Sequence, residues 1–422
     1  MRVRTFLSVT MSILFLAACG GGSATSSGLQ VVRDTAGDTI VVRTVSGSVW
    51  GAPATLVPEV SIGRMEGDPH YLFGAVNSVA VAADGTIYVV DSQVAEVRAF
   101  DPTGAWVRTL GRRGQGPGEL EQPEAVAVLS DGRVIVRDPG NARLQVYGPD
   151  GSPVTTWLLR SMLHTSAPLW TDRHDDVYIE FLVNIDPVTR AWHIDLIRYG
   201  SDGAVRDTLQ PPDHGYRTPV VEAHFGKGSS ASYGVPFTPS EHWTVHPDGY
   251  FVYGLSTDYR IDLLRADAPV LRIERSSEPV AVQSGEKEAR KQEIEHRMQG
   301  MVPGWKWNGP SIPDTKPPFG DILTGQDGRV WVAVPRPAVE KPNPDYDPKK
   351  PDSQATSWIE PVAFDVFEPD GTYLGRVNAP EDFTMYPWPF VRGDTVWAVT
   401  SDSLGVQRVV RYHVQHGGAA RS

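Results

Sequence analysis

The sequence is poor in three features on which many proteins depend. It holds a single cysteine among 422 residues, so disulfide bonds cannot support the fold, which must rest on an apolar core. Beyond the N-terminal segment, no apolar run approaches the roughly 18 residues of a membrane-spanning helix. Cationic side chains are outnumbered, with 39 Lys and Arg against 51 Asp and Glu. This acidity disfavours nucleic acid as a partner, because each phosphate contact needs a cation.

The common catalytic and cofactor motifs are also missing. The chain has no Gly-x-Ser-x-Gly and no cysteine that could act as a nucleophile in a folded domain. The glycine-rich run 114–118 lacks the Lys-Ser/Thr pair and the following helix of a phosphate loop, so we interpret it as a turn. The sequence therefore predicts no cofactor.

The N-terminal eighteen residues are a targeting segment. Arg2 and Arg4 precede a mostly apolar stretch that is too short to span a bilayer as a helix. The segment ends in Leu-Ala-Ala-Cys19, which resembles the lipobox of bacterial lipoproteins, in which the cysteine receives a diacylglycerol. We expect a signal peptide over residues 1–18, lipidation of Cys19 and a flexible tether over residues 19–28. An ordinary secretory signal with an incidental cysteine is the alternative.

The expected location follows from the same segment. By resemblance to known sorting rules, Gly20 after the lipidated cysteine indicates the outer membrane of a Gram-negative cell. The lipid would then be the membrane attachment, and the protein would face the periplasm or the cell surface.

An internal repeat predicts the fold. Val79–Asp91 and Val126–Asp138 share alternating apolar positions around an Asp-Gly turn, and the second copy follows the first after 47 residues. Asp-Gly between alternating strands is the strongest short-range signal for a β-hairpin. Four fainter copies bring the number of units to six, with their turns at 175–176, 248–249, 327–328 and 393–394. Each unit has two apolar faces, which radial stacking of four-stranded blades would bury.

We therefore predict an all-β fold, a six-bladed β-propeller of four-stranded antiparallel blades with one inserted helix. A single, monomeric domain would span residues 29–416, followed by a disordered tail over residues 417–422. The last unit lacks an outer strand after Tyr412, so we expect residues 60–62 to supply that strand and close the ring. Two separate β-sandwiches are the alternative, which the repeat shared by both halves disfavours.

A family resemblance agrees with this prediction. The run from Gly111 to Leu120, followed by Pro123, Asp131-Gly132 and residues 141–147, is similar to an NHL-type repeat. The whole body resembles the six-bladed β-propeller lipoproteins of Gram-negative bacteria, most closely over residues 60–160. That family is defined mainly by its fold, so the resemblance implies an architecture and says little about function.

Two insertions depart from the repeat. Residues 284–299 predict a helix with Glu286–Arg290 and Glu293–Arg297 as i,i+4 ion pairs and Gly300 at its end. This helix is either a solvated decoration or a lid. Residues 335–357 are rich in Pro, Lys and Asp and predict an extended, mobile loop. Calcium binding by the loop is disfavoured, because prolines and a lysine pair accompany its acidic residues Asp345, Asp347 and Asp352.

Departures from the aligned repeat give the candidate ligand-binding residues. Arg137, Glu180 and Tyr253 stand at the ends of second strands, where they could form a polar patch near the channel or, alternatively, an inter-blade salt bridge. Phe319 and Trp388 follow prolines just before inner strands, and Arg336 lies in the proline-rich insertion. Trp, Tyr and Arg are the residue types that most often anchor interfaces.

These residues predict a binding protein. We expect one propeller face, formed mainly by the third to fifth units, to recognise a periplasmic or cell-surface protein or glycan. A lyase or lactone hydrolase acting in the central channel is the alternative. A zinc site would need three His or carboxylate ligands at equivalent positions of different blades, and the positions that match His246 carry Ala83, Ser130 and Gln326. We therefore expect no metal and no catalytic residues.

Overall fold

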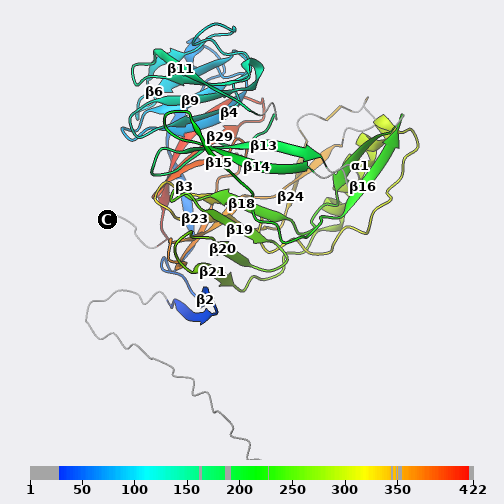
Figure 1. Ribbon diagram of the computed structural model, residues 1–422. Coiled ribbons are helices and arrows are strands. Elements are labelled where there is room, and N and C mark those ends of the chain that lie inside the picture. Colours follow the sequence, from blue (N-terminus) through cyan, green and yellow to red (C-terminus); the bar gives the residue numbers. More distant parts are fainter. Residues whose placement is uncertain are drawn as a thin grey trace, which may run out of the picture.

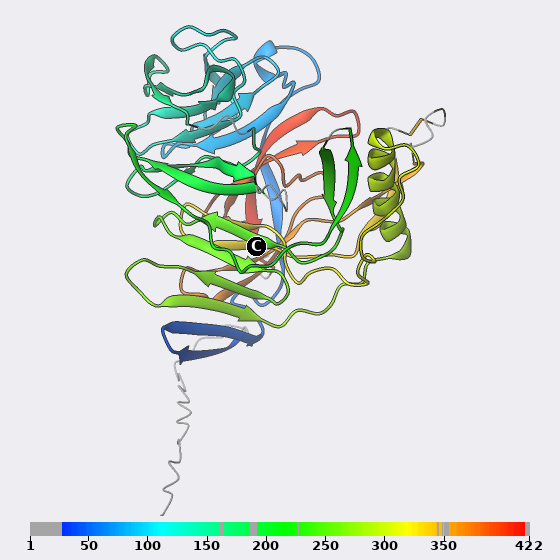
Figure 2. The same ribbon diagram turned by 45° about the vertical axis from the view of Figure 1, so that its right-hand side comes forward.

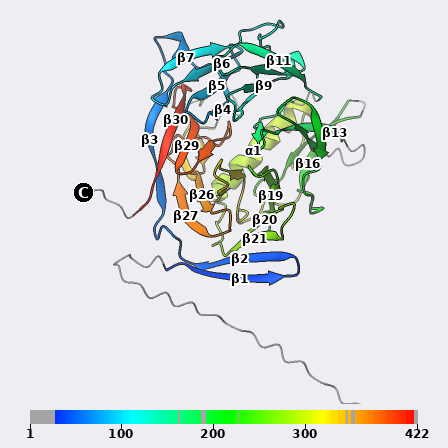
Figure 3. The ribbon, with the colours of Figure 1, turned by 60° about the vertical axis from the view of Figure 1, so that its left-hand side comes forward.

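The chain folds into six antiparallel blades around a central axis (Figures 1 and 3). The computed structural model describes residues 28–160, 164–185, 192–226, 228–343, 346–347, 349 and 354–417. The predicted signal peptide and Cys19 lie outside these residues, as does the predicted tail from residue 418 onward. The predicted six-bladed β-propeller is confirmed.

Four strands form each blade, and the first of them lies nearest the axis. The first three blades, from the innermost strand outward, consist of β4 (Val76–Val81), β5 (Ile87–Asp91), β6 (Glu96–Phe100) and β7 (Trp106–Leu110); β8 (Ala125–Val128), β9 (Val134–Asp138), β10 (Arg143–Tyr147) and β11 (Pro153–Leu158); and β12 (Trp170–Thr171), β13 (Val177–Ile185), β14 (Trp192–Tyr199) and β15 (Val205–Leu209).

The other three blades follow the same order, except that the last takes its outer strand from the N-terminal region. They consist of β18 (Glu241–Val245), β19 (Phe251–Leu255), β20 (Arg260–Leu263) and β21 (Val270–Arg275); β22 (Ile322–Thr324), β23 (Val330–Ala333), β26 (Ala363–Phe367) and β27 (Tyr373–Asn378); and β28 (Phe390–Arg392), β29 (Thr395–Ser401), β30 (Gln407–Gln415) and β3 (Ala54–Ile62).

Asp-Gly turns join the first and second strands at one face of the ring, which we call the turn face. Asp84 Oδ1 accepts the N–H of Thr86 at 2.9 Å, and Gly85 has a φ of +89°, a conformation that favours glycine. The arrangement recurs in the next blade, where Asp131 Oδ1 accepts the N–H of Arg133 at 3.0 Å. The repeated dipeptide therefore encodes the turn itself.

The aspartate that ends each of the first two copies of the repeat binds the segment that enters its own blade. Asp91 accepts the N–H groups of Gly74 and Ala75 at 3.0 and 3.1 Å. Asp138 accepts the N–H of Gln122 at 2.8 Å, and both carboxylates are fully buried. Each aspartate thus fixes the chain that arrives from the preceding blade, which explains its place in the repeat.

The apolar core lies between adjacent blades. One cluster joins Val252, Ile261 and Ile273 of the fourth blade to Val330 and Phe367 of the fifth. Burying an aliphatic or aromatic side chain of this size contributes roughly 1.5–3 kcal/mol. Both apolar faces of a repeat unit are used in this way, as the sequence predicts.

The N-terminal strand β3 closes the ring. It pairs antiparallel with β30, and Ile62 lies opposite Val409 (Figure 3). This confirms the prediction that residues 60–62 complete the last blade, although β3 begins earlier, at Ala54.

The chain before β3 also runs along the outer rim. β1 (Gln30–Ala36) and β2 (Thr39–Ser46) form a hairpin, and β2 pairs parallel with β21 of the fourth blade. Trp50 N–H then donates to the carbonyl oxygen of Leu374 in the fifth blade at 2.9 Å. Residues 30–62, which we call the belt, therefore contact the outer strands of the fourth and fifth blades and supply the outer strand of the sixth.

Long connections gather on the face opposite the turns, which we call the insertion face. They contain the hairpin of β16 (Val220–Phe225) and β17 (Ser229–Gly234), the helix α1 (Ser284–Met301), and the hairpin of β24 (Val339–Pro342) and β25 (Thr356–Ile359). α1 lies beside β16 and β17 in both side views (Figures 1 and 2). Ile294, Met298 and Trp305 pack there against Val221 and Ala223. We call these three insertions the cap.

The insertions differ from the prediction in three details. α1 continues to Met301, so Gly300 lies inside the helix. Arg297 donates to Glu293 at 2.7 Å as predicted, but Glu286 does not pair with Arg290. Glu286 is buried and accepts from Lys316 Nζ at 2.7 Å, because this side of the helix faces protein and not water. The ends of the predicted extended loop pair as β24 and β25.

Among the described residues, no helix combines the length and hydropathy of a membrane span.

Candidate functional site

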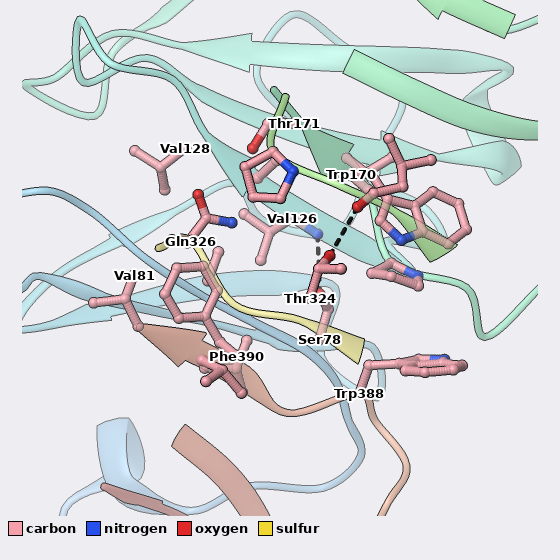
Figure 4. A pocket seen from close by; sticks show the side chains of 18 of the residues that line it. Ser78, Val81, Val126, Val128, Trp170, Thr171, Thr324, Gln326, Trp388 and Phe390 are labelled. Atoms are coloured by element: carbon pink, nitrogen blue, oxygen red, sulfur yellow. Dashed lines mark hydrogen bonds between the residues drawn. The ribbon is translucent and has the colours of Figure 1, made fainter. Parts of the chain in front are cut away.

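A cavity of about 380 Å³ occupies the central channel. Residues of all six innermost strands line it, and its size falls in the usual range for small-molecule pockets. Trp170 and Trp388 lie at one end of the cavity, and Val81, Val128 and Gln326 lie at the other (Figure 4). The two tryptophans belong to the insertion face, because the innermost strands begin there.

Polar groups in the channel wall tie neighbouring blades together. The N–H of Val126 donates to Ser78 Oγ at 3.2 Å, and Trp170 Nε1 donates to Thr244 Oγ1 at 3.0 Å. Thr324 Oγ1 donates to the carbonyl oxygen of Val245 at 2.8 Å (Figure 4). These groups satisfy one another, while the channel wall as a whole offers a ligand both apolar and polar surface.

A second ring of polar side chains stands at the mouth of the channel. Residues two positions apart on a strand share a face. His242 and Asp321 precede by two positions Thr244 and Leu323, which line the cavity, and Tyr386 lies in the connection before β28, where it hydrogen-bonds Asp321. They therefore lie one layer above the cavity, toward the insertion face, and they come from the fourth, fifth and sixth blades.

These side chains form one hydrogen-bonded chain with Ser240. Ser240 Oγ lies 2.9 Å from His242 Nε2, and His242 Nδ1 lies 3.3 Å from Asp321 Oδ1. Tyr386 donates its hydroxyl proton to Asp321 Oδ2 at 2.7 Å. The side chains of His242 and Asp321 keep 17% and 28% exposure, so solvent reaches this group of hydrogen-bonded side chains.

The electrostatics of this chain keep Asp321 ionised. Burial alone would raise the pKa of Asp321, but the hydrogen bonds from His242 and Tyr386 outweigh burial and hold the pKa below its ordinary value. Desolvation and the adjacent Asp321 carboxylate raise the pKa of Tyr386, which therefore keeps its proton.

Two of the predicted residues, Arg137 and Glu180, take part in a separate polar cluster between the second and third blades. Arg137 Nη1 lies 3.0 Å from Glu124 Oε2, and Glu124 also contacts the ring of the exposed His164. Glu180 accepts from Thr165 Oγ1 at 2.7 Å. Burial raises the pKa of Glu180, while Thr165 and the positive charge of Arg137 act against that rise. Arg137 and Glu180 therefore interact across the blade boundary through their charges, whereas the close ion pair of Arg137 is with Glu124.

The other predicted residues are dispersed. Tyr253 hydrogen-bonds His214 Nε2 at 2.8 Å, and its ring stacks on that imidazole. Phe319 is buried in the core, where it contacts Tyr259, so it cannot offer a surface contact. Its role is packing, because the chain before β22 turns inward at this point.

Arg336 and Trp388 lie nearer the channel mouth and the cap. The N–H of Arg336 donates to Glu360 Oε1 at 2.8 Å, and its carbonyl oxygen accepts from Lys316 at 3.1 Å. Trp388 lines the cavity and packs edge-on against Tyr386, with 5.5 Å between the ring centroids. Of the six predicted residues, Trp388 is the one placed directly in the channel.

Sequence reasoning missed Ser240, His242, Asp321 and Tyr386. Ser240, His242 and Asp321 stand at or directly before the start of an innermost strand, whereas Tyr386 lies in the connection before β28, which the repeat does not cover. An alignment of the starts of the innermost strands, as opposed to the ends of the second strands, would have found Ser240-Glu-His242 and Asp321. No three His, Cys, Asp or Glu side chains gather as a possible metal site in the part of the chain that the structure describes.

Comparison with known proteins agrees on the fold. Residues 64–165 match a protein family described as 6-bladed beta-propeller. No curated protein sequence matches the chain. A crystal structure of a member of the DUF4221 family from Bacteroides vulgatus is 10% identical, with a TM-score of 0.50, and the match covers 86% of this chain and 99% of that one.

Two propeller enzymes also match over most of their lengths. A streptogramin B lyase is 10% identical, with a TM-score of 0.37 and coverage of 85% of this chain and 98% of the lyase. A gluconolactonase from Xanthomonas campestris is 12% identical, with a TM-score of 0.39 and coverage of 87% and 99%. At these identities the likeness concerns the fold alone. The protein is a six-bladed β-propeller, and its function must be argued from its own site.

Proposed function

We propose that this protein is a lipid-anchored binding protein of the bacterial envelope that recognises a protein or glycan through the insertion face. The single observation that carries the proposal is the position of the insertions. The three insertions that form the cap lie on the same face as Trp170 and Trp388, which stand at one end of the cavity. Strands and tight turns serve the fold, whereas connections on one face are free to carry recognition.

The cap borders the mouth of the channel. Lys341 of β24 forms an ion pair with Glu381, which lies in the connection that also carries Tyr386 and Trp388. On the other side, β17 leads through Phe237 to Ser240. A ligand seated between the cap and the ring would therefore reach the cavity. Because the cavity holds about 380 Å³, only a sugar unit or the end of a peptide could enter it.

The N-terminal residues supply the envelope location. The lipobox-like Leu-Ala-Ala-Cys19 and the glycine-rich tether support a lipid anchor, and Gly20 supports the outer membrane. The first described residue, Gly28, leads directly into β1 at the outer rim. A tether over the preceding residues would therefore be attached at the outer rim and not at the channel.

The proposal is tested by capture from envelope extracts. The full chain in detergent is immobilised and incubated with extracts that have been treated with protease, with glycosidases or with neither. Treatment that abolishes capture identifies the ligand as protein or glycan. We expect Trp388→Ala to reduce capture at least tenfold when capture is measured well below the melting temperature of the variant, which should fall modestly because Trp388 also packs on the core.

A matched control is Trp106→Ala, which removes an exposed tryptophan from the outer strand of the first blade. This variant should capture as much ligand as the parent. Equal capture by both variants and the parent would contradict a binding site at the channel mouth.

A further inference from the structure

The geometry points to a second property of the channel mouth: we propose that Ser240, His242 and Asp321 form a nucleophile, a general base and an orienting carboxylate for the hydrolysis of a carboxylic ester. This activity goes beyond ligand binding and rests on different residues. Trp388 carries the binding proposal, whereas the hydrolytic site depends on the hydrogen bonds among these three side chains.

The orientation of His242 is the main observation. Its Nε2 lies 2.9 Å from Ser240 Oγ, and its Nδ1 lies 3.3 Å from Asp321 Oδ1. An ionised Asp321 can only accept a hydrogen bond, so it selects the tautomer with the proton on Nδ1. The lone pair of Nε2 then faces the serine hydroxyl. Serine hydrolases on unrelated folds share this arrangement of roles, which is recognised by geometry and not by sequence order.

The fold holds each member of the arrangement in place. Ser240 directly precedes β18 and continues its register through the bond to Ser256, so its side chain shares one face of the fourth blade with that of His242. The hydroxyl of the buried Ser256 accepts the N–H of Ser240 at 2.9 Å. Tyr386 holds the second oxygen of Asp321 at 2.7 Å. Ser256 and Tyr386 are therefore positioning residues for the nucleophile and the carboxylate.

The strand register also provides a donor for an oxyanion. The N–H of Ser256 donates to the carbonyl oxygen of Ser240 at 3.0 Å, which makes these residues a hydrogen-bonded pair of the ladder. Pairs alternate along antiparallel strands, so Glu241 is at a position whose N–H points away from β19. β18 is the edge strand of its sheet, so this N–H faces the channel. A main-chain N–H next to the nucleophile can stabilise the negative charge that develops on a carbonyl oxygen.

The reaction needs only the ester and water. Ser240 Oγ attacks the carbonyl carbon while its proton passes to His242 Nε2. The bond to the alcohol oxygen then breaks, the alcohol leaves with the proton from His242, and an acyl ester of Ser240 remains. Water attacks that ester and gives a proton to His242, and the carboxylic acid leaves as Ser240 recovers its proton. The cavity below the site includes the aliphatic side chains of Val126, Val128 and Leu323, so a short acyl chain could enter it.

Fluorophosphonate labelling tests the inference on the full chain. Attack by an activated serine forms an Oγ–P bond and expels fluoride, and peptide mass spectrometry locates the label. We expect the label on Ser240, at least a hundredfold slower labelling in His242→Ala, and no label at this site in Ser240→Ala. Hydrolysis of p-nitrophenyl acetate and butyrate should fall in parallel with the labelling rate.

Two controls separate catalysis from structure. His224→Ala removes an exposed histidine of the cap and should label at the rate of the parent. Asp321→Asn preserves shape but favours the wrong tautomer, so it should slow labelling while leaving the melting temperature near that of the parent. Absence of label on Ser240, or labelling of His242→Ala at the parent rate, would overturn the inference. Ligand capture by Ser240→Ala would be unaffected, so the binding proposal stands or falls separately.

Discussion

Lys316 Nζ lies 2.7 Å from Glu286 Oε1, and the two side chains keep only 2% and 4% exposure. Lys316 also contacts Glu360 Oε2 at 2.6 Å and the carbonyl oxygen of Arg336 at 3.1 Å. This one ammonium group therefore joins α1 to the connection between β25 and β26. The cap is fastened to the ring by a buried charge network as well as by apolar packing.

Removing Lys316 should release the cap. Lys316→Ala leaves Glu286 buried without its partner, which costs about 3–5 kcal/mol when a buried pair is broken. Hydrogen exchange should show lost protection in α1 and β16, while the strands of the first blade stay protected. Lys287→Ala breaks an exposed pair with Asp314 and serves as the control, which should leave exchange unchanged. Uniform loss of protection across all blades would contradict a local role.

We expect ring closure to require β3 of the belt but not β1 and β2. A chain that begins at residue 64 lacks β3 and leaves an edge of β30 unpaired, so it should aggregate and melt earlier. A chain that begins at Gly47 lacks β1 and β2 but keeps β3, so it should stay monomeric. Size-exclusion chromatography with light scattering distinguishes the two. If both truncated chains behave alike, β3 does not have the closing role that its pairing indicates.

His246 should make stability depend on pH. It is fully buried, donates from Nε2 to the carbonyl oxygen of Gly328, and has its pKa lowered by burial from 6.5 to about 4. The unfolded chain binds a proton below pH 6.5 while the folded chain does not. Stability is therefore full above pH 6.5 and falls by about 3 kcal/mol as the pH drops to about 4.

Urea unfolding at pH 7 and pH 4.5 measures this effect by comparing the parent with His246→Gln, which cannot titrate. The loss of stability between the two pH values should be smaller in His246→Gln. His224→Ala, which changes an exposed histidine, should follow the parent. An identical pH dependence in all three proteins would exclude His246 as the source.

The lipid anchor has a direct test. Cys19→Ser removes the thiol that would carry the diacylglycerol, so the variant should leave the membrane fraction and appear in the soluble fraction. Radiolabelled palmitate should enter the parent and not the variant. Extraction of the variant by detergent alone would show that another segment holds the protein to the membrane.

The repeat predicted the parts of the structure that recur, and the site lies mostly in the parts that do not. Asp84 and Asp131 specify turns by local hydrogen bonds, so their roles could be predicted from neighbouring residues. Asp321 and Tyr386 meet because the ring brings separate connections together, which no local pattern records. Glu286 was assigned to Arg290 for a similar reason: its real partner, Lys316, is 30 positions away and is selected by burial.

The belt also sets the order in which the molecule can be completed. Arg411 contacts Glu59 across 352 positions of the chain, so β3 must wait for β30 before it finds its partner. Loop-closure entropy rises only by about 0.6 kcal/mol per doubling of length, so this separation costs little at equilibrium. It affects kinetics instead, because contacts distant in sequence form late. During synthesis the blades would stack as an open arc, and β3, although it emerges before every blade, would be the last strand to reach its place.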